Sequence, residues 1–322
     1  MTSEPNPGPA AAIGAPGAPV TQRLGPDSVV AITVTWRRVE LLEALLTALA
    51  HQTRPVDLVI VVDNGADRAV AELVAAHPGA SVYLPSWHRL GSAGGFALGA
   101  LTALARGAGW VWFFDDDARP ATSDCLRELL ACAAERRLAM VAPAVVNVDN
   151  PGELSFLMRR GLAWVRDPGG LRERKFLPGY ASFFNGALFG ADALDVVGVP
   201  DSRLFLRGEE VEIYRRARRS GLPFGTCLTT AVLHPSGLGD FHSILGGSFH
   251  VPDPPNPSKR YYTFRNRGYL STQPGRRLRW PLDCVVFTWY FLVVRRDLTG
   301  FREWLRLARM GRRERLLRDT EP

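Results

Sequence analysis

The chain has 322 residues, of which 46% are hydrophobic, and a formal net charge of +7 at pH 7. This is enough apolar material for one large core, or for one core with a smaller second one. The four cysteines form no CxxC pair, and Cys125 and Cys132 stand about 10 Å apart along a predicted helix, too far for a disulfide. The composition therefore excludes a disulfide-stabilised scaffold, and we expect buried, reduced thiols.

Residues 1–27 are rich in Pro, Gly and Ala, with no apolar period and almost no charge. Such a composition does not offset the entropy that is lost on ordering, so we expect a disordered tail. The segment lacks the basic start and the apolar run of a signal peptide, and we expect the protein to stay in the cytoplasm.

From residue 28 onward, short apolar runs alternate with segments of helical spacing. The expected strands are 28–35, 57–63, 81–84, 110–114 and 140–147, and the expected helices are 39–51, 69–76, 94–106 and 122–137. This alternation indicates βαβ units and an α/β fold with a mostly parallel sheet that is covered on both faces. Ligands bind beyond the carboxyl ends of the strands in such sheets, so the polar residues after each strand are the candidates for a site.

After about residue 150 the alternation is less regular. Residues 182–190 are typical of a strand with a turn inside it, 211–221 of a helix, and 224–228 of a short strand. Residues 259–318 have a helical pattern that mixes aromatic residues with arginines. We therefore divide the chain into the tail (1–27), an α/β domain (28–255, with halves 28–150 and 151–255) and a basic helical region (256–322).

Three consecutive carboxylates, Asp115, Asp116 and Asp117, follow the strand 110–114. They repel one another and lower stability unless a cation neutralises them. An Asp-rich turn or a helix cap explains such a run without a ligand, but the position after a buried strand favours Mg²⁺ or Mn²⁺, which prefer oxygen ligands. Alternation puts Asp115 and Asp117 on one side, so we expect these two to bind the metal and Asp116 to face a nucleotide or a cationic partner.

Two other strand ends carry polar groups. Strand 28–35 ends at Thr35 and is followed by Trp36 and Arg38, which suit a base and a phosphate. Strand 57–63 ends in Asp63, before Asn64. Asn-Gly is a turn dipeptide, but a carboxylate and an amide at this position also suit a ribose or a uracil edge.

The segment that starts at Arg89 contains Gly91, Gly94 and Gly95, between a strand and a helix. Its spacing, G-x-x-G-G, differs from the dinucleotide fingerprint G-x-G-x-x-G and follows the third strand rather than the first, which excludes a Rossmann NAD site. Glycines that open a helix still allow a ligand to approach the backbone closely.

Acidic residues gather where Glu209, Glu210 and Glu212 begin a helix. Compensation of the helix dipole explains them without a function, and the alternative is a general base that takes a proton from an acceptor hydroxyl. His234 follows an apolar run and is either structural or a nitrogen ligand for the metal.

These features, in this order, resemble the GT-A fold of family 2 glycosyltransferases over residues 28–270. The resemblance lies in TxxR (35–38), the Asp of VVDNG (61–65), RLGSAGGF (89–96), the Asp triplet, the acidic pair and the late His. The segments WVWFFDDD, SFFNGALF, RLFLRGEEVE and KRYYTFRNRGY are similar to the actinobacterial galactofuranosyltransferases that initiate cell-wall galactan. That similarity implies inverting transfer of galactofuranose from UDP-galactofuranose to rhamnosyl-N-acetylglucosaminyl-diphospho-polyprenol, followed by a second residue.

The resemblance also implies roles for individual residues. It implies a divalent metal (Mn²⁺ or Mg²⁺) held by Asp115, Asp117 and His234, and a catalytic base at Glu210. Donor binding is implied for Thr35, Trp36, Arg38, Asp63, Asn64, Arg89, Gly91, Gly94, Gly95 and Asp116, and acceptor binding for Asn185, Gly186, Glu209 and Arg265. Two features depart from the family pattern: the base is Glu rather than Asp, and Ala187 and Leu188 follow the Asn-Gly pair where the polymerising enzymes carry two Trp.

Positive charge is concentrated in residues 255–322, which hold 16 Lys and Arg against 6 Asp and Glu. This asymmetry indicates an anionic partner, either a membrane or a nucleic acid. The apolar stretch 280–294 is too short for a bilayer, which needs about 20 residues, so it is either a core helix or an in-plane helix. We favour an in-plane helix on the inner face of the plasma membrane, because the implied acceptor is a lipid diphosphate. Arg260, Arg265 and Arg267 are candidates for contact with that diphosphate.

Two other functions fit the same residues. A rhamnosyltransferase that uses dTDP-rhamnose on a similar lipid acceptor needs the same kind of site. A non-catalytic protein that senses a nucleotide or binds nucleic acid is the other alternative. The C-terminal arginines would serve it, but the acidic triplet repels nucleic acid beside the site, so we expect no nucleic-acid partner. The sequence is compatible with an oligomer.

Overall fold

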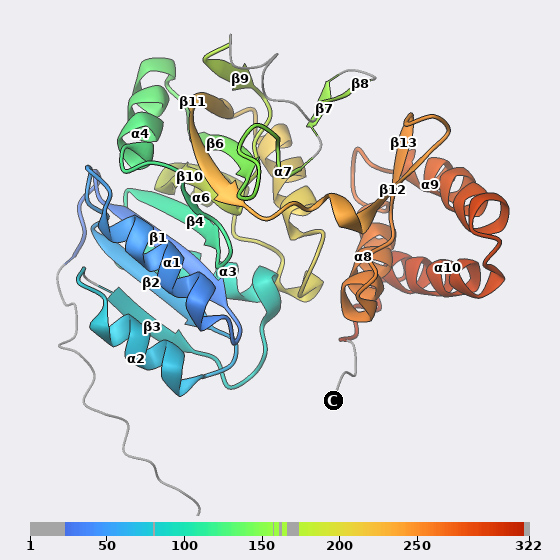
Figure 1. Ribbon diagram of the computed structural model, residues 1–322, viewed down its shortest axis with the longest axis horizontal. Coiled ribbons are helices and arrows are strands. Elements are labelled where there is room, and N and C mark those ends of the chain that lie inside the picture. Colours follow the sequence, from blue (N-terminus) through green and yellow to red (C-terminus); the bar gives the residue numbers. More distant parts are fainter. Residues whose placement is uncertain (1–22, 80, 157, 161–162, 166–173, 319–322) are drawn as a thin grey trace, which may run out of the picture.

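The computed structural model describes residues 23–79, 81–156, 158–160, 163–165 and 174–318 (Figure 1). Most of the expected tail, 1–22, lies outside these residues. Its last part belongs to the folded body: the N–H of Leu24 donates to the carbonyl oxygen of Arg106 at 2.9 Å, and Leu24 packs against the main core. The folded part therefore begins a few residues before residue 28.

A nine-stranded sheet forms the centre of the molecule. Its path runs β3 (Ser81–Pro85), β2 (Leu58–Asp63), β1 (Val29–Thr35), β4 (Trp110–Asp115), β10 (Asn185–Gly190), β6 (Met140–Asn147), β11 (Phe224–His234) and β5 (Arg119–Pro120). The strands from β3 to β4 are parallel, as is the pair β6–β11, whereas β10 runs antiparallel between β4 and β6. β9 (Phe176–Pro178) adds to β11. The expected α/β architecture with a mostly parallel central sheet is confirmed; β10 is inserted antiparallel in its centre, and the short strands β5 and β9 pair antiparallel with β11.

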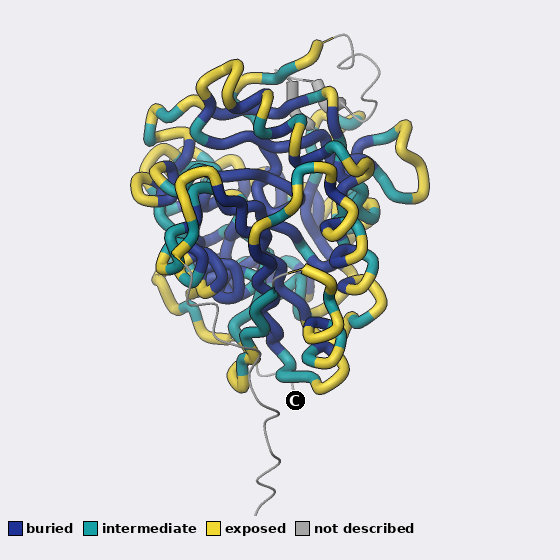
Figure 2. The backbone as a smooth tube through the Cα atoms, turned by 90° about the vertical axis from the view of Figure 1, so that its left-hand side faces the viewer, coloured by how far each residue is buried: buried dark blue, intermediate teal, exposed yellow. Residues whose placement is uncertain are grey.

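Helices cover both faces of the sheet (Figures 1 and 2). One face is covered by α3 (Gly91–Ala105), α6 (Ala191–Val197) and α7 (Glu209–Ser220). The other face is covered by α1 (Val39–Ala50), α2 (Arg68–Ala76) and α4 (Cys125–Arg136). Successive residues of β1 alternate between the two hydrophobic clusters on either side of the sheet. Val30 and Ile32 pack on the side of α3, and Val29 and Ala31 pack on the side of α1.

A second hydrophobic core lies in the C-terminal part. Its helices are α8 (Pro257–Leu270), α9 (Arg279–Thr288), the π-helical segment η3 (Trp289–Val294) and α10 (Leu298–Arg312). They surround Phe287 and Trp304, whose rings stack with centroids 4.9 Å apart. The hairpin of β12 (Phe241–Ile244) and β13 (Phe249–Pro252) contributes Ile244 and Val251. This core therefore includes residues ahead of 256, the boundary that the sequence predicts, and the helical pattern expected over 259–318 corresponds to α8, α9, η3 and α10.

The remaining short elements are β7 (Met158–Arg160), β8 (Ala163–Val165), η1 (Ser202–Leu204) and η2 (Leu238–Asp240). Two predicted boundaries change. The helix expected at 94–106 begins at Gly91, so the glycine segment is its first turn. The strand expected at 224–228 continues to His234, because a register shift after Cys227 lets the strand pass the polar Thr229 and Thr230 and pair again with β6. Within the described residues, none of the helices combines the length and the apolar character that a membrane crossing requires.

Candidate active site

Polar residues from five strands meet at one edge of the sheet. Thr35 and Asp63, the last residues of β1 and β2, are register partners, and Asp115 ends β4 beside them. β10 runs the opposite way, so its first residue, Asn185, lies at this edge. His234 ends β11 at the same edge. The fold therefore brings together residues that are up to 200 positions apart in the chain, at the place where a sheet of this kind binds ligands.

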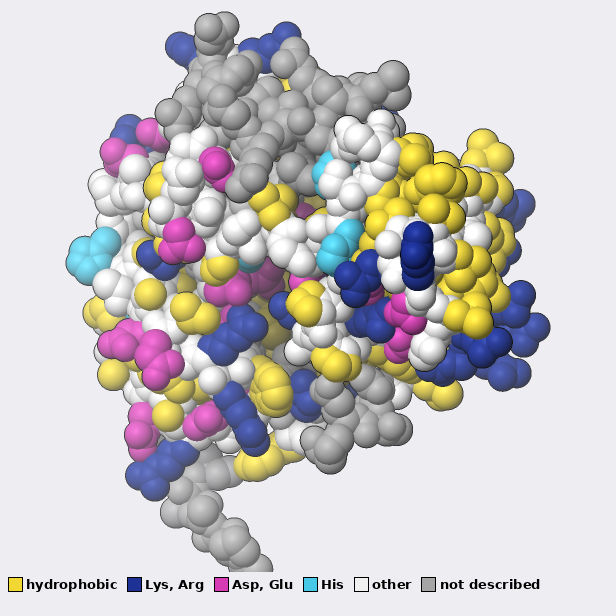
Figure 3. Space-filling view, turned by 45° about the vertical axis from the view of Figure 1, so that its right-hand side comes forward, with side chains coloured by type: hydrophobic (Ala, Val, Ile, Leu, Met, Phe, Trp, Pro, Cys, Tyr) yellow, Lys and Arg dark blue, Asp and Glu magenta, His cyan; other side chains and the backbone are white. Residues whose placement is uncertain are grey.

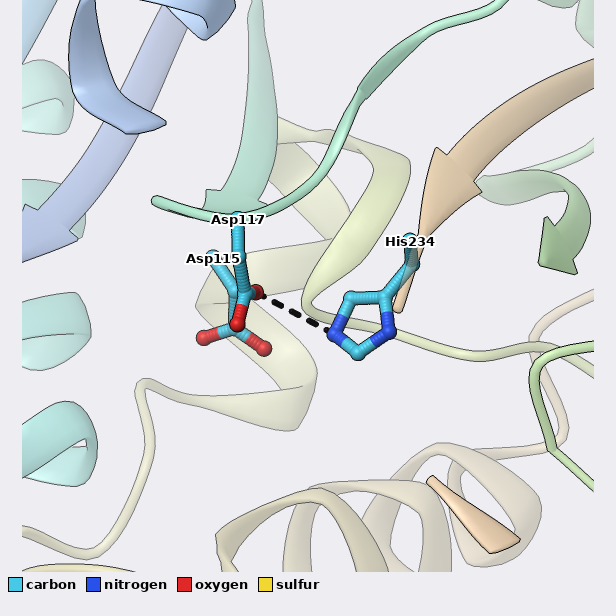
Figure 4. Close-up of side chains that lie close together, drawn as sticks. All are labelled: Asp115, Asp117 and His234. Atoms are coloured by element: carbon cyan, nitrogen blue, oxygen red, sulfur yellow. Dashed lines mark ion pairs between the residues drawn. The ribbon is translucent and has the colours of Figure 1, made fainter. Parts of the chain in front are cut away.

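Asp115, Asp117 and His234 form a group of three potential metal ligands (Figure 4). One ligand atom from each residue lies within 4.8 Å of the others, and Nε2 of His234 is 3.2 Å from a carboxylate oxygen of Asp117. Nδ1 of His234 is 2.5 Å from the carbonyl oxygen of Pro235. A proton on Nδ1 that is donated to this carbonyl leaves the lone pair of Nε2 directed at the carboxylates. Two carboxylates and an imidazole are a donor set that fits Mn²⁺ or Mg²⁺.

The charges at this edge are unevenly balanced. Burial, followed by the charges of four neighbouring carboxylates, raises the pKa of Asp115 well above its usual value. In decreasing order of effect, these neighbours are Asp117, Asp116, Glu209 and Glu210. Burial alone would also raise the pKa of Asp117, but His234 and Arg38 outweigh it and lower that pKa. The excess of negative charge around Asp115 is what a bound cation neutralises.

Asp116 has a partner for each of its two carboxylate oxygens. One of its oxygens accepts a hydrogen bond from the hydroxyl of Thr35 at 2.9 Å, and the other is 3.0 Å from Arg38. The same guanidinium nitrogen of Arg38 is 3.0 Å from Asp117. Asp116 therefore faces a cation, which is one of the two alternatives expected for it, and this cation, Arg38, also lies beside the candidate metal ligand Asp117.

Asp63 and Asn64 hold the backbone around the site. The buried carboxylate of Asp63 accepts from two N–H groups of the following turn, at 2.8 and 2.6 Å, and from the hydroxyl of Tyr83 at 2.8 Å. The amide of Asn64 accepts from the N–H of Leu90 at 2.9 Å and donates to the carbonyl oxygen of Gly91 at 3.1 Å. These bonds join the turn after β2 to the start of α3.

The glycines at the start of α3 are explained by close packing. A Cβ on Gly95 would lie 2.5 Å from the side chain of Val34, and one on Gly94 would lie 2.9 Å from Leu90. Gly91 has a φ of +68°, and its added Cβ would lie 2.0 Å from the carbonyl oxygen of Phe205. The segment therefore lies directly against β1 and against the loop before α7.

An exposed aromatic surface stands beside this segment. Trp36 is 42% exposed, and the guanidinium carbon of Arg89 lies 4.0 Å from the centroid of its ring. Arg89 also lies 5.8 Å from the ring of Phe205. A planar guanidinium over an indole is a favourable contact, and the pair offers flat surface to a base.

Glu210 and Glu209 begin α7 and face the site from its other side. One oxygen of Glu210 accepts from the hydroxyl of Ser182 at 2.8 Å and from the N–H of Phe183 at 2.9 Å. The other oxygen has no hydrogen-bond partner among the described residues. Glu209 accepts from the hydroxyl of Ser92 at 2.7 Å, and its second oxygen is buried without a partner in the described part of the chain. Burial raises the pKa of Glu209.

The loop before α7 has a strained backbone. Phe205 and Arg207 have φ values of +65°, and Gly208 follows with +97°. Asn266 of α8 supports this loop, since its side-chain amide donates to three loop carbonyl groups. Positive φ in residues other than glycine costs free energy and persists where the surroundings enforce it. Here the enforced loop fixes where Glu209 and Glu210 begin the helix.

Arg265 supports the same loop. It is fully buried, and it donates to the carbonyl oxygen of Leu204 at 2.8 Å and to the side chain of Asn266 at 2.8 Å. The two other arginines expected near an acceptor diphosphate are also paired, Arg260 with Asp253 and Glu303, and Arg267 with Asp283. We therefore replace the acceptor role expected for Arg265 with a structural one, because its guanidinium group is enclosed by protein.

Asn185 and Gly186 complete the site. Asn185 is 3% exposed; its side-chain N–H donates to Ser182 at 3.3 Å, and its carbonyl oxygen is buried without a partner among the described residues. Gly186 has a φ of +89°, and its carbonyl oxygen accepts from the indole of Trp112 at 2.8 Å. Asn185 thus carries a buried acceptor oxygen beside Ser182, the residue whose hydroxyl donates to Glu210.

Two functional candidates were not predicted from the sequence. Ser182 and Ser92 each donate to one of the paired glutamates. Both lie inside motifs that the sequence singled out, Ser182 three residues before Asn185 and Ser92 between the glycines. A single serine forms no sequence motif that would indicate a role, so only the contacts with the glutamates in the folded structure identify Ser182 and Ser92 as candidates.

The sequence of this chain is similar to those of known proteins. The family model described as "Glycosyl transferase family 2" matches residues 30–192. The chain is 55% identical to the galactofuranosyltransferase GlfT1 of Mycolicibacterium smegmatis, over 91% of this chain and 99% of that protein. It is 52% identical to GlfT1 of Mycobacterium tuberculosis, over 90% of this chain and 97% of that protein.

Solved structures share the fold at low sequence identity. The crystal structure of GalNAc-T7 with UDP, GalNAc and Mn²⁺ aligns with a TM-score of 0.56 and 14% identity, over 76% of this chain and 47% of that one. The mannosyltransferase PcManGT from Pyrobaculum calidifontis, in complex with GDP-Man and Mn²⁺, aligns with a TM-score of 0.52 and 15% identity, over 94% and 79% of the two chains.

Proposed function

The chain belongs to glycosyltransferase family 2, and within this family we propose that it is an inverting galactofuranosyltransferase. It transfers galactofuranose from UDP-galactofuranose to rhamnosyl-N-acetylglucosaminyl-diphospho-polyprenol, and so adds the first residue of galactan and then a second. The observation that carries this proposal is the 55% identity to a galactofuranosyltransferase over 99% of that protein's length.

The donor lies at the strand edge. Asp115, Asp117 and His234 would hold a divalent metal, Mn²⁺ or Mg²⁺, which supplies charge stabilisation to the diphosphate that leaves. Arg38 stands beside two of the three carboxylates of the triplet and adds a fixed positive charge there. Trp36, stacked under an arginine, offers a face to the uracil.

The remaining donor residues act by shaping this surface. The hydrogen bond between Thr35 and Asp116 orients both side chains. Asp63 and Asn64 hold the turn after β2 and the start of α3 through their hydrogen bonds. Arg89 stacks on the aromatic wall, and Gly91, Gly94 and Gly95 bring the helix close to β1. In this proposal the nucleotide contacts the outer surface that these bonds hold in place.

Glu210 is the catalytic base in this proposal. Two hydrogen bonds hold one of its oxygens, and the other oxygen takes the proton from the acceptor hydroxyl as that hydroxyl attacks the anomeric carbon. Attack from the side opposite the UDP inverts the configuration. The unpartnered oxygens of Asn185 and Glu209 accept hydrogen bonds from acceptor hydroxyls, and Gly186 leaves space beside them.

The C-terminal part supports contact with a membrane surface. Of the 18 large hydrophobic side chains that are exposed in the described part of the chain, eight fall between residues 278 and 298. They are Leu278, Leu282, Val285, Trp289, Leu292, Val293, Val294 and Leu298. Figure 3 shows hydrophobic side chains gathered over this region, bordered by Lys and Arg. Such an arrangement fits a helix that lies in the interface of an anionic leaflet.

Transfer to a defined acceptor tests the proposed function. The protein is incubated with Mn²⁺, UDP-galactofuranose and a synthetic rhamnosyl-N-acetylglucosaminyl lipid diphosphate, and the products are analysed by mass spectrometry. We expect products that carry one and two added hexose units. A parallel reaction with dTDP-rhamnose tests the alternative donor, and transfer from that donor alone would overturn the proposal.

A further inference from the structure

A surface cavity of about 460 Å³ lies along the outer side of α10. Its lining contains arginine and apolar residues only: Arg302, Leu305, Arg306, Arg309, Met310, Arg313, Arg315 and Leu317. The volume is in the range of small-ligand sites, and such sites combine an apolar floor with a few polar groups. This cavity is separate from the residues of the candidate active site.

The five arginines of the cavity have no ion-pair or side-chain hydrogen-bond partner among the described residues. Spacings of four, three and four residues put Arg302, Arg306, Arg309 and Arg313 on one face of the helix. The two glutamates of this segment are engaged elsewhere, Glu303 with Arg260 and Glu314 near Arg203. Like charges at these spacings destabilise a helix, so an anion that binds here would be stabilising.

Other arginines in the same region are held by the protein. Arg312, also on α10, donates to Ser271 at 2.9 Å and stacks 4.4 Å from the ring of Trp280. Arg267 makes two bonds of 2.7 Å to Asp283. The fold thus pairs Arg312 and Arg267, whereas the arginines along the cavity have no such partner among the described residues.

The apolar part of the lining restricts which anion fits. Leu305, Met310 and Leu317 lie between the guanidinium groups, and Leu317 is 66% exposed. A free phosphate makes no favourable contact with these apolar side chains. A nucleic acid would need aromatic side chains on which its bases could stack, and this lining contains none. An anionic group attached to hydrocarbon uses both the arginines and the floor.

We propose that this cavity binds the phosphate headgroup of an anionic phospholipid, with the glycerol end of the acyl chains on the apolar floor. Arginine suits phosphate because its planar fork donates two parallel hydrogen bonds to the phosphate oxygens. The proposal rests on the membrane contact proposed above, and it adds a specific lipid site to that contact. The exposed hydrophobic residues of α9 and η3 supply the adjoining apolar surface.

The test compares two variants of the full chain with the same loss of charge. Arg306→Gln with Arg309→Gln removes two cavity arginines, and Arg218→Gln with Arg219→Gln removes an exposed pair at the end of α7 as the matched control. Binding is measured to phosphatidylcholine vesicles with and without phosphatidylglycerol. Removal of two basic residues from an anionic surface predicts a loss of about 30-fold for the cavity variant, and less than about threefold for the control pair.

Soluble ligands separate the sources of the phosphate. We expect dihexanoyl-phosphatidylglycerol, below its micellar concentration, to raise the Tm of the wild type but not of the cavity variant, and Leu317→Ser to weaken that shift. Three results would overturn the proposal: an equal loss for both arginine pairs, pyrophosphate binding as strong as that of the short-chain lipid, or an effect of the cavity variant on RNA binding alone.

The activity of the cavity variant is measured as sugar transfer to a water-soluble acceptor without a lipid chain. This activity does not depend on lipid binding, so the two proposals are tested separately. The cavity variant should retain that activity, since its substitutions lie outside the candidate active site. Loss of lipid binding with retained transfer supports the site, whereas absence of transfer in the wild type, to the lipid-linked acceptor as well as to the soluble one, would contradict the proposed function and leave the binding result valid.

Discussion

At the scale of single residues, the carboxylate groups at the strand edge differ in how the protein holds them. Glu210 has one oxygen fixed by two donors and one oxygen open, whereas Asp116 has both oxygens engaged. Asp115 accepts no hydrogen bond at its side chain from any described residue, and it is surrounded by other carboxylates. These differences are consistent with the roles proposed for the three residues: Glu210 as the base, Asp116 as a positioning group and Asp115 as a metal ligand.

We expect Glu210→Gln to lower kcat by about 10²- to 10⁴-fold, the usual contribution of a general base. The amide keeps the shape of the side chain but does not accept the proton of the acceptor hydroxyl. Donor affinity should be unchanged, which titration with UDP in the presence of Mn²⁺ checks. Glu209→Gln is the comparison, and a larger loss of kcat in that variant would move the base to Glu209.

We expect Asp115→Asn to raise the Tm of the metal-free protein near neutral pH. The pKa of Asp115 is raised in the folded state, so folding favours its protonated form and stability falls as pH rises from its unfolded value towards its folded value. At neutral pH the charged carboxylate therefore opposes folding, and the amide removes this cost. The difference in Tm between variant and wild type should shrink as the pH is lowered.

Asp117→Asn is the matched control, and its effect should have the opposite sign. The pKa of Asp117 is lowered in the folded state, because its interactions with His234 and Arg38 outweigh burial, so its charge stabilises the fold above its unfolded pKa. Mn²⁺ should raise the Tm of the wild type and of neither variant. A Mn²⁺ shift retained in both would contradict the proposed ligand set.

At the scale of elements, the site depends on how closely α3 lies on the sheet. Gly95 and Gly99 face Val34 and Ile32 of β1, and an added Cβ would lie 2.5 and 2.4 Å from those side chains. The first turn of the helix is thereby brought to the level of the strand ends, where Ser92 meets Glu209. The glycine motif therefore acts on the site through packing.

We expect Gly95→Ala to lower the free energy of unfolding by about 1–3 kcal/mol, the usual cost of forcing an extra carbon into a packed core. Val34 is buried and β-branched, so it has little freedom to move away. Gly239→Ala is the control, because no atom lies within 4 Å of the added Cβ there. Urea unfolding measures the stability of both variants. Equal midpoints would contradict the prediction, because they would show that α3 moves away from β1 without a loss of stability.

At the scale of the whole molecule, the C-terminal helices form a second body that is joined to the first through α8. The buried Arg265 and Asn266 hold the loop before α7, while Phe264 lies in the second core. The outer side of α9 and η3 is left uncovered by the described residues, although their inner side packs around Trp304. The exposed apolar surface of α9 and η3 therefore belongs to the same C-terminal part that supports the loop before α7.

We expect the pair Val285→Asp and Val293→Asp to lower binding to anionic vesicles at least about tenfold. Each substitution removes an apolar side chain that would be buried in the membrane and adds a negative charge that the anionic lipids repel. These residues are 69% and 50% exposed, so folding should be unaffected. Leu101→Asp, at a position on α3 that is 56% exposed, is the control. Flotation assays measure binding, and undiminished flotation of the double variant would contradict the membrane contact.

Much of this arrangement was predictable from local patterns. Period-two and helical spacing locate the elements around the triplet, and the order of strands and helices predicts that Thr35, Asp63 and Asp115 share an edge. The same reasoning failed at Arg265, because a pattern of aromatic residues and arginines does not distinguish an arginine that faces a ligand from one enclosed under a loop. It also missed the antiparallel β10, whose direction depends on pairing with two strands distant in sequence.

The sequence by itself determined the chemistry of the protein: an acidic triplet after a buried strand, an acidic pair at a helix start, and a basic, apolar C-terminal part. These follow from residue type and local spacing, which the backbone period fixes. Only the tertiary structure decided which oxygen of Glu210 is open, which arginines are paired and which face of α9 is uncovered. Those properties depend on contacts between residues far apart in the chain, such as Ser182 with Glu210 and Arg265 with Leu204, and no local period encodes them.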